Sequence, residues 1–232
     1  QKQSPAPRAE TEPRAQADGR SRCAYRGDDA EAAGVRDRGG HLGVADVVHA
    51  ALDGGLQAVQ LREKDLDSRD LYNLAAKIRV LTRQYSAAFL INDRIDVALA
   101  TEADGVHLGT TSFPVSKTRQ MLGTSKIIGV STHSPEEIAG ARGADFIVFG
   151  PTYSTPSKTR YGPPQGLKRL QQAVSQNVAP VLAIGGIREE NILDVLRTNA
   201  AGIAAISAIT TAPDAAKTVR RMLEILGGNA HR

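Results

Sequence analysis

The hydrophobic residues from position 44 onward alternate between two spacings. A first set recurs every three or four residues, which places it on one face of a helix that ends at Gly54. This set consists of Val44, Val47, Val48 and Ala51. Residues 58–62 then form a short apolar run, which is typical of a buried strand. The pattern therefore predicts a helix followed by a buried strand as its first unit.

The same unit recurs to the end of the chain. Further strands are predicted at 89–91, 105–108, 127–130, 146–149, 181–184 and 203–206. Helices are predicted at 95–100, 167–174, 191–197 and 215–226. Three more are predicted to begin at Ser68, which caps its helix, at Pro114, and at Ser134, which opens a capping signature. Strict alternation of strands and helices indicates a parallel sheet with right-handed crossovers. Seven such units fit an α/β fold of the (β/α)₈ TIM-barrel type better than an open sheet.

The first strand of this barrel is poorly defined by the sequence. Residues 1–40 hold three prolines and seven arginines but no Leu or Ile, so they offer little apolar surface to bury. We expect residues 1–40 to be a disordered or non-native tail and residues 41–232 to be a single barrel domain. Two alternatives remain for the missing strand. Either Cys23, Ala24 and Tyr25 form a poor strand, or the natural N-terminus differs from this one.

Composition narrows the class of ligand and the cellular location. The net charge of +4 is mild, and there is no Trp and few Phe or Tyr. This balance favours small anionic substrates over nucleic acid, which calls for basic patches and stacking aromatics. A single cysteine excludes an internal disulfide and a cysteine-built zinc site, and it favours the cytoplasm. No apolar run approaches the roughly 18 residues of a membrane span, so no membrane partner is expected.

Glycines and cations follow the predicted strand ends, where the active site of a barrel lies. Gly186 and Ser207 follow the seventh and eighth strands, where free backbone N–H groups can hold a phosphate. The alternative for the glycine pair is an ordinary tight turn. Arg62 and Lys64 lie two residues apart at a strand end and suit a diphosphate, unless they form a solvated surface pair. Lys158 lies in a long loop and is a second candidate phosphate clamp, unless that loop is plain surface.

Four further polar residues follow strands three, four and five. Asn92 and Asp93 precede a helix, so they can cap it, bind Mg²⁺ through oxygen, or do both. His107 and His133 are each isolated in the sequence. We interpret His107 as a packing or hydrogen-bonding residue and keep His133 as a candidate general acid or base.

Seven short runs together resemble one enzyme superfamily. They lie at 59–64, 92–94, 104–109, 129–133, 155–158, 183–187 and 206–209. In order and spacing they are similar to the thiamine-phosphate synthase family and its close relative, the thiazole tautomerase, over residues 42–227. The synthase joins a pyrimidine diphosphate to a thiazole phosphate and releases diphosphate. The resemblance thus implies a transferase of thiamine biosynthesis whose partners are phosphorylated small molecules, with a homo-oligomer as an open possibility.

The resemblance also implies a role for each matching residue. The pyrimidine diphosphate would be held by residues of the second and third strand ends, by the fifth strand and by the long loop, namely Gln60, Arg62, Glu63, Lys64, Asn92, Ser131 and Lys158. The thiazole phosphate would contact Thr155, Ser157, Gly186, Ile206 and Ser207. Arg62, Lys158 and His133 are the candidate catalytic residues. Mg²⁺ is the implied cofactor, with Asp93 and Ser112 as its candidate ligands.

One position departs from the synthase pattern. Ser112 stands where that pattern places a second Mg²⁺-binding carboxylate, and a hydroxyl is a weaker ligand for a hard cation. The tautomerase branch often lacks this carboxylate and would use His133 for proton transfer. A third alternative is a non-catalytic regulator that binds thiazole phosphate. Because Arg62, Lys64, Asn92, Asp93 and Lys158 are all present, the sequence favours the synthase.

Overall fold

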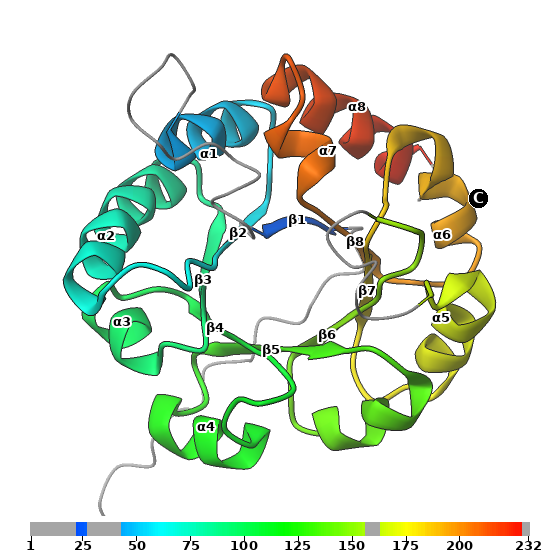
Figure 1. Ribbon diagram of the computed structural model, residues 1–232, viewed down its shortest axis with the longest axis horizontal. Helices are drawn as coiled ribbons and strands as arrows, with labels where there is room; N and C mark the ends of the chain where they lie inside the picture. The colour runs from blue at the N-terminus through cyan, green and yellow to red at the C-terminus, as the bar shows by residue number, and fades with distance from the viewer. Residues whose placement is uncertain (1–21, 27–42, 156–162, 229–232) are drawn as a thin grey trace, which may run out of the picture.

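Eight parallel strands close into a barrel, and the helices surround it (Figure 1). The computed structural model describes residues 43–155 and 163–228 and the backbone of residues 22–26. Each strand pairs with its neighbours in chain order, and the last strand, β8, pairs with the first, β1. The expected (β/α)₈ barrel is therefore confirmed.

The strands are β1 (Arg22–Arg26), β2 (Ala58–Leu61), β3 (Ala88–Asn92), β4 (Gly105–Leu108), β5 (Ile127–Thr132), β6 (Phe146–Phe149), β7 (Val181–Ile184) and β8 (Gly202–Ala205). The α-helices are α1 (Val44–Asp53), α2 (Ser68–Gln84), α3 (Ile95–Ala100), α4 (Val115–Leu122), α5 (Gly166–Ser175), α6 (Ile192–Leu196), α7 (Ser207–Thr210) and α8 (Ala215–Gly227). Two 3₁₀ helices, η1 (Pro135–Ala141) and η3 (Glu189–Asn191), replace the helix starts expected at Ser134 and Asn191.

Strand β1 supplies the missing first strand. It pairs in parallel with β2, where Tyr25 lies opposite Val59, and with β8, where Cys23 lies opposite Ile203. Of the two alternatives left by the sequence, the poor strand at Cys23 to Tyr25 is the one observed. The barrel domain thus includes part of the range 1–40 that was assigned to a tail, and the rest of that range lies outside the described residues. Residues 22–26 form a strand although few of them favour one, because the edges of β2 and β8 would otherwise lack a hydrogen-bonding partner.

Two helix starts differ from expectation for local reasons. The cap of α2 is Asp67 rather than Ser68, because its carboxylate accepts hydrogen bonds from the backbone N–H groups of Arg69 and Asp70, both at 2.9 Å. The Ser68 hydroxyl instead accepts from Arg94 Nη2 at 3.0 Å. At η1, Glu137 accepts from the backbone N–H of His133 at 2.8 Å, which joins the helix to the end of β5.

The apolar core has two layers, because side chains of a strand alternate between the helices and the barrel lumen. The larger layer lies between strands and helices and includes Phe89, Ile128 and Phe149, all fully buried. The smaller layer fills the lumen on β6, β7 and β8. It consists of Val148, Leu182 and Ala204, with Phe146, Ile184 and Ala201 packed against them.

The lumen is polar on its other side. Residues that pair across parallel strands face the same side of a sheet. The pairing of Ser131 with Val148 therefore places Ser131 in the lumen, and the pairings of Gly129 with His107 and of His107 with Asn92 place those residues there too. Gln60 pairs with Leu90, which lies two residues before Asn92 on β3, so Gln60 faces the lumen as well. The wall of the lumen on β2 to β5 thus carries the polar side chains beside the apolar Leu90, and the opposite wall, on β6 to β8, is apolar.

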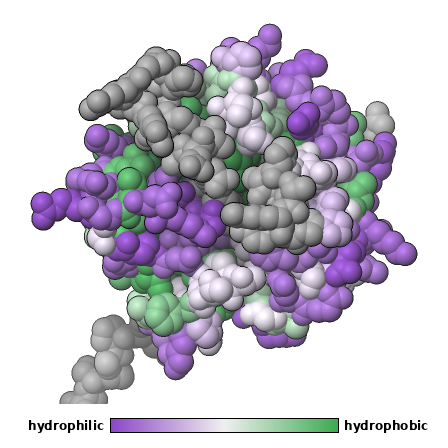
Figure 2. Space-filling model, viewed as in Figure 1, coloured by the Kyte–Doolittle hydropathy of each residue, from purple (hydrophilic) through white to green (hydrophobic). Residues whose placement is uncertain are grey.

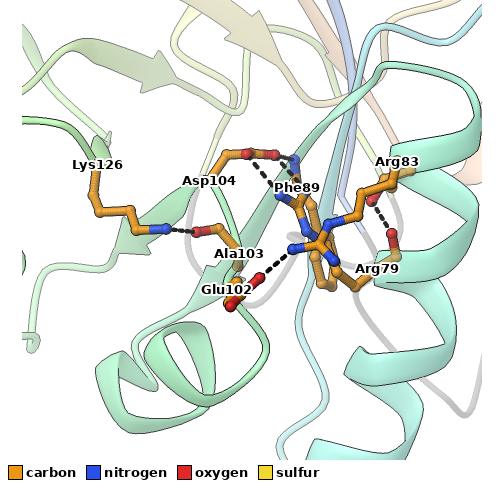
Figure 3. A network of polar contacts seen from close by, with 8 residues as sticks. Arg79, Arg83, Phe89, Glu102, Ala103, Asp104 and Lys126 are labelled. Carbon is orange, nitrogen blue, oxygen red and sulfur yellow. Dashed lines mark hydrogen bonds and ion pairs between the residues drawn. The ribbon is translucent and has the colours of Figure 1, made fainter.

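A polar network ties the strands to the helices at the amino end of the barrel (Figure 3). The Asp104 carboxylate accepts hydrogen bonds from Arg79 at 2.8 and 3.0 Å and from the backbone N–H of Phe89 at 2.7 Å. Lys126 Nζ donates to the carbonyl of Ala103 at 2.6 Å. A second aspartate repeats this arrangement two strands on. It is Asp145, which accepts from the backbone N–H of Ile128 at 2.8 Å and from Arg119 at 2.6 Å.

The outer surface carries mostly hydrophilic side chains, with smaller hydrophobic areas between them on the face shown in Figure 2. Among the helices of the described ranges, none combines the length and the apolar composition that crossing a bilayer requires.

Candidate active site at the barrel mouth

The polar wall of the lumen leads to the carboxyl ends of β2 and β3. Gln60 is 5% exposed, and its Nε2 donates to Asn92 Oδ1 at 3.2 Å. Arg62 and Glu63 follow β2 directly and are half-buried, while Lys64 is exposed. Because Leu61 pairs with Ile91, these cations lie at the same edge of the barrel as Asn92. The fold therefore brings the first group of expected substrate-binding residues together at one side of the mouth.

Asp93 is held in an unusual backbone conformation at this edge. Its φ of 58° lies in the left-handed region, which Asp tolerates better than most residues, and its N–H donates to the His107 carbonyl at 3.0 Å. Its carboxylate accepts from Asn92 Nδ2 at 3.0 Å and from the Ser112 hydroxyl. The hydroxyl in turn accepts from the Gly109 N–H at 2.6 Å. Ser112 thus contacts the expected metal-binding carboxylate directly.

Asn92 and Asp93 do not cap the following helix. The cap position of α3 is Arg94, and its side chain makes no capping hydrogen bond. The Arg94 guanidinium instead binds Asp96 at 2.6 Å, and that hydrogen bond lowers the pKa of the Asp96 carboxyl below its usual value. The capping alternative for Asn92 and Asp93 is therefore wrong. Both side chains instead form hydrogen bonds at the mouth of the barrel.

A buried histidine supports the next strand end. His107 is fully buried, and its Nε2 lies 2.8 Å from the hydroxyl of Ser131, which is 5% exposed. The ring also contacts Phe146, with centroids 5.7 Å apart. Gly129 makes this packing possible, since a Cβ there would lie 2.6 Å from His107 Nδ1 and 2.3 Å from Phe146 Cζ. The interpretation of His107 as a packing and hydrogen-bonding residue is confirmed.

Glycines shape the opposite side of the mouth, after β7. Gly185 and Gly186 have φ of 94° and 67°, a region that residues with a Cβ rarely adopt. A Cβ on Gly186 would also lie 2.7 Å from Tyr153 Cβ and 2.8 Å from the Ser154 carbonyl oxygen. The turn is therefore tight, as one alternative held, and it also lets another loop approach closely. Asn191 Nδ2 donates to the Gly186 carbonyl at 2.9 Å and fixes the turn to the helix behind it.

Ile206 and Ser207 lie beside this glycine turn. They follow β8, whose Ala204 pairs with Ile184 of β7. Ser207 is exposed and begins the short helix α7, and Ile206 occupies its cap position. Three of the five residues expected to bind the thiazole phosphate, Gly186, Ile206 and Ser207, are thus on neighbouring strand ends.

The long loop between β6 and α5 rests on the glycine turn. The N–H groups of Thr152 and Tyr153 donate to the carbonyls of Ile184 and Gly185 at 2.7 and 2.9 Å. At the far end of the loop, the N–H of Gln165 donates to the Pro151 carbonyl at 2.8 Å. Both ends of the loop are therefore held beside β7. Thr155 is half-buried in this loop, while the expected positions of Ser157 and Lys158 lie outside the described residues.

Sequence reasoning did not single out Tyr153. Its hydroxyl is buried and has no hydrogen-bond partner among the described residues. Burial raises the pKa of this hydroxyl, and the negative charge of Asp194 raises it further. The only sequence signal was its position within the long loop, because the contact with Gly186 exists only in the folded chain.

His133 directly follows the end of β5, two residues after Ser131. Its ring Nδ1 is 3.5 Å from Glu137 Oε2, and its side chain is 44% exposed. The structure thus pairs His133 with a surface carboxylate of η1.

The donor set at Asp93 suits a hard cation only in part. No three His, Cys, Asp or Glu side chains gather into a metal site anywhere in the described ranges. Asp93 offers an exposed carboxylate with neutral oxygen neighbours, and Mg²⁺ often takes one or two carboxylates and completes its shell with water and phosphate oxygens. The residues present therefore fit Mg²⁺ if the substrate supplies further oxygens.

The fold and this site define an α/β-barrel enzyme whose polar groups converge on its carboxyl-terminal mouth. Residues 36–209 match a protein family described as thiamine monophosphate synthase. The chain belongs to this family.

Relatives with known names agree with this assignment. The chain is 49% identical over 170 residues to a thiamine-phosphate synthase of Synechocystis, which covers 72% of the chain and 49% of that protein. It is 41% identical to a thiamine-phosphate synthase of Moorella thermoacetica, over 81% of the chain and 90% of that protein. The structure of a thiamine phosphate pyrophosphorylase from Pyrococcus furiosus superposes with a TM-score of 0.77 at 34% identity, covering 90% of the chain and 96% of that protein. The expectation of a synthase, and thus of a transferase, is confirmed.

Proposed function

We propose that the chain couples a hydroxymethylpyrimidine diphosphate to a thiazole phosphate at the barrel mouth and yields thiamine phosphate and diphosphate. The observation that carries this assignment is the division of the mouth. Polar side chains of β2 to β5 stand on one side, the Gly186 turn stands on the other, and the lumen wall below the turn is apolar. Two phosphorylated molecules need two separate phosphate-binding regions, and the side chains of β2 to β5 and the backbone N–H groups of the glycine turn are suited to one each.

The polar wall is proposed to hold the pyrimidine diphosphate. Arg62 and Lys64 face the diphosphate, since a guanidinium fork and an ammonium together complement its charge. Gln60, Glu63 and Asn92 orient this substrate, and Ser131 contacts the pyrimidine with its hydroxyl. The hydrogen bonds between Gln60 and Asn92 and between Ser131 and His107 support this role, because side chains that are already held lose less entropy when they bind.

The glycine turn and the long loop are proposed to hold the thiazole phosphate. Backbone N–H groups near Gly186, Ile206 and Ser207 and the hydroxyls of Thr155 and Ser157 are suitable donors to phosphate oxygens. Lys158 belongs to the same loop in the sequence and is proposed to contact the diphosphate.

The chemistry needs charge stabilisation more than acid–base catalysis. The bond between the pyrimidine methylene carbon and the diphosphate oxygen breaks, and its electron pair leaves with the diphosphate. The thiazole nitrogen then donates its lone pair to that carbon. Arg62 and Lys158 lower the barrier by stabilising the negative charge on the departing oxygens, and the two sites hold the nitrogen in line with the carbon. Mg²⁺ held at Asp93 would add positive charge to the same oxygens. The cytoplasm is the proposed location, as the single cysteine suggests.

The direct test is incubation of the purified chain with both substrates and Mg²⁺, with thiamine phosphate measured by chromatography. We expect product only when all components are present. Absence of product under these conditions, with a folded protein, would contradict the assignment.

Arg62→Ala provides a test at the residue level. We expect kcat/KM for the pyrimidine diphosphate to fall by roughly a hundredfold or more, because a lost charge-stabilising donor costs about that much. The circular dichroism spectrum should not change. Lys117→Ala, an exposed lysine of α4, is the control and should retain full activity.

A further inference from the structure

Tyr153 joins the long loop between β6 and α5 to the glycine turn after β7. Its backbone N–H donates to the Gly185 carbonyl at 2.9 Å. A Cβ on Gly186 would lie 2.7 Å from Tyr153 Cβ, so the two segments touch at a point where the turn carries no side chain. The backbone of the loop is therefore seated on the turn at Tyr153.

The ring of Tyr153 holds the loop on the side of the surrounding helices. It packs against the main hydrophobic core between strands and helices. The charge of Asp194 on α6 is, after burial, the second cause of the raised pKa of its hydroxyl, so the ring reaches toward that helix. Buried tyrosine hydroxyls usually find a hydrogen-bond partner, but this one has none among the described residues. The apolar contacts of the ring are thus what anchors the side chain.

The residues on either side of Tyr153 extend this anchor to the expected phosphate site. Thr152 is 1% exposed, its N–H donates to the Ile184 carbonyl at 2.7 Å, and its carbonyl accepts from the Gly166 N–H at 3.0 Å. Thr155 is half-buried and follows Tyr153 by two residues. A residue spans at most about 3.6 Å of chain, so Thr155 lies within roughly 7 Å of Tyr153. A displacement of Tyr153 therefore also displaces Thr155.

We propose that Tyr153 is a positioning residue for the thiazole phosphate, because its anchored ring holds Thr155 beside the glycine turn before this substrate binds. The inference rests on the proposed function, which places the thiazole phosphate between Gly186 and Thr155. A loop that is already ordered loses less conformational entropy on binding, so the anchored ring increases the affinity for this substrate. The pyrimidine diphosphate is proposed to bind on the other side of the mouth and does not depend on the ring.

Steady-state kinetics of two variants of the full chain test this role. In Tyr153→Ala, which removes the ring, we expect KM for the thiazole phosphate to rise about tenfold. This factor equals roughly 1.4 kcal/mol, which is the cost of ordering about one residue. KM for the pyrimidine diphosphate and kcat should stay within about twofold of the natural values, because only the binding of one substrate is weakened. Tyr153→Phe keeps the ring and should restore the natural KM, since the hydroxyl has no described partner.

Control variants separate positioning from a general loss of stability. Val219→Ala removes two methyl groups from a fully buried residue of α8, far along the chain from the loop. Tyr72→Ala removes the same side chain as Tyr153→Ala from an exposed position on α2. Both variants should keep the natural KM for the thiazole phosphate. If Tyr153→Ala is insoluble, Tyr153→Leu takes its place, and its KM should lie between those of the natural chain and the tenfold rise.

The two KM values and the product distinguish the possible outcomes. Similar losses in Tyr153→Phe and Tyr153→Ala would make the hydroxyl a substrate ligand and overturn the positioning role. Equal rises in both KM values would show a general structural role and would also overturn it. An unchanged KM for the thiazole phosphate in an active Tyr153→Ala protein would overturn the inference and leave the proposed function intact.

Calorimetric titration with thiazole phosphate alone tests the inference without turnover. We expect Tyr153→Ala to bind this compound about tenfold more weakly than the natural chain and Tyr153→Phe to bind it equally well. This result from a natural chain that forms no thiamine phosphate would support the inference and contradict the proposed activity.

Discussion

At the scale of single residues, the site depends on two glycines, because their missing Cβ atoms let neighbouring groups approach closely. Gly129 leaves room for the rings of His107 and Phe146, and Gly186 leaves room for the loop that carries Tyr153. In both places a Cβ would come within 2.8 Å of a neighbouring atom. Substituting either glycine should therefore lower the stability of the folded protein.

Gly129→Ala tests this view of the lumen. The added methyl group would overlap the buried ring of His107 and the half-buried ring of Phe146, and overpacking of a dense core costs about 1–3 kcal/mol. We expect a loss of this size in urea unfolding, together with weaker pyrimidine diphosphate binding as His107 moves away from Ser131. Gly140→Ala is the control, because a Cβ at Gly140 meets nothing within 4 Å. Equal stability of the two variants would contradict the packing argument.

Tyr153→Phe tests the buried hydroxyl. Removing a hydroxyl that has no described partner relieves its desolvation, so we expect stability to stay level or to rise by up to about 1 kcal/mol. The raised pKa adds a pH dependence. Because the folded chain holds this proton more tightly than the unfolded chain does, the free energy of unfolding falls as the pH rises from the unfolded pKa of about 10 through the folded pKa. Tyr153→Phe should therefore lose less stability at alkaline pH than the natural chain.

Thermal unfolding between neutral and alkaline pH measures this difference. Tyr72→Phe, at an exposed tyrosine of α2, is the control and should follow the natural chain throughout. A clear loss of stability in Tyr153→Phe at neutral pH would show that the hydroxyl is bound in the folded protein.

At the scale of elements, the two ends of the barrel serve different purposes. The amino end is built from pairs such as Arg79 and Asp104, which fasten a helix to two strands (Figure 3). The carboxyl end carries Asp93 after β3, Ser131 near the end of β5 and Gly186 after β7. This division follows from the parallel sheet, which gathers all carboxyl ends on one face. Changes at the amino end should therefore affect stability and leave activity intact.

Asp104→Asn tests the amino end. The substitution removes the charge that binds Arg79 and weakens the hydrogen bond to Phe89, and a hydrogen bond to a charged group contributes about 1.5–3 kcal/mol. Because Asp104 is 34% exposed, solvent screening should keep the loss in denaturant unfolding near the lower value. The kcat of the surviving folded enzyme should not change.

Glu102→Gln provides the comparison for the same network. Glu102 pairs with Arg83 on the surface, where both side chains are more than half exposed. Such pairs contribute only about 0–1 kcal/mol, so this variant should be nearly as stable as the natural chain. A larger loss of unfolding free energy for Glu102→Gln than for Asp104→Asn would contradict this ranking of the two ion pairs.

At the scale of the whole molecule, closure of the barrel depends on its least regular strand. Strand β1 contains few strand formers, and yet it joins β2 to β8 and completes the ring in Figure 1. Closure also keeps the two halves of the mouth at a fixed separation. Damage to β1 should therefore reach the active site although β1 holds none of the proposed catalytic residues.

Ala24→Pro tests closure directly. Ala24 pairs with both Ala58 and Ala204, and proline removes the backbone donor that such a central strand needs. We expect a loss of about 3 kcal/mol or an insoluble protein, measured by denaturant unfolding or by soluble yield. Ala24→Gly keeps the N–H group and should remain folded with a smaller loss. A fully stable Ala24→Pro protein would show that the ring does not need this strand.

The barrel and several residues at its mouth could be predicted from the amino-acid sequence. Hydrophobic spacing is a local property, so the helices and seven strands could be predicted from it, and the strand ends then indicated Arg62, Asn92 and Gly186. Strand β1 could be named only as one of two alternatives, because its short sequence contains few strand formers and its pairing with β2 and β8 arises only when the barrel closes.

The contacts among the residues of the mouth became visible only in the folded chain. The bond between His107 and Ser131, the contact of Tyr153 with the Gly186 turn, and the link from Ser112 to Asp93 all join residues that are 19 or more positions apart. Local pattern carries no information on such contacts, because they arise from the register and closure of the sheet. For the same reason the capping interpretation of Asp93 was plausible from the sequence and wrong in the fold.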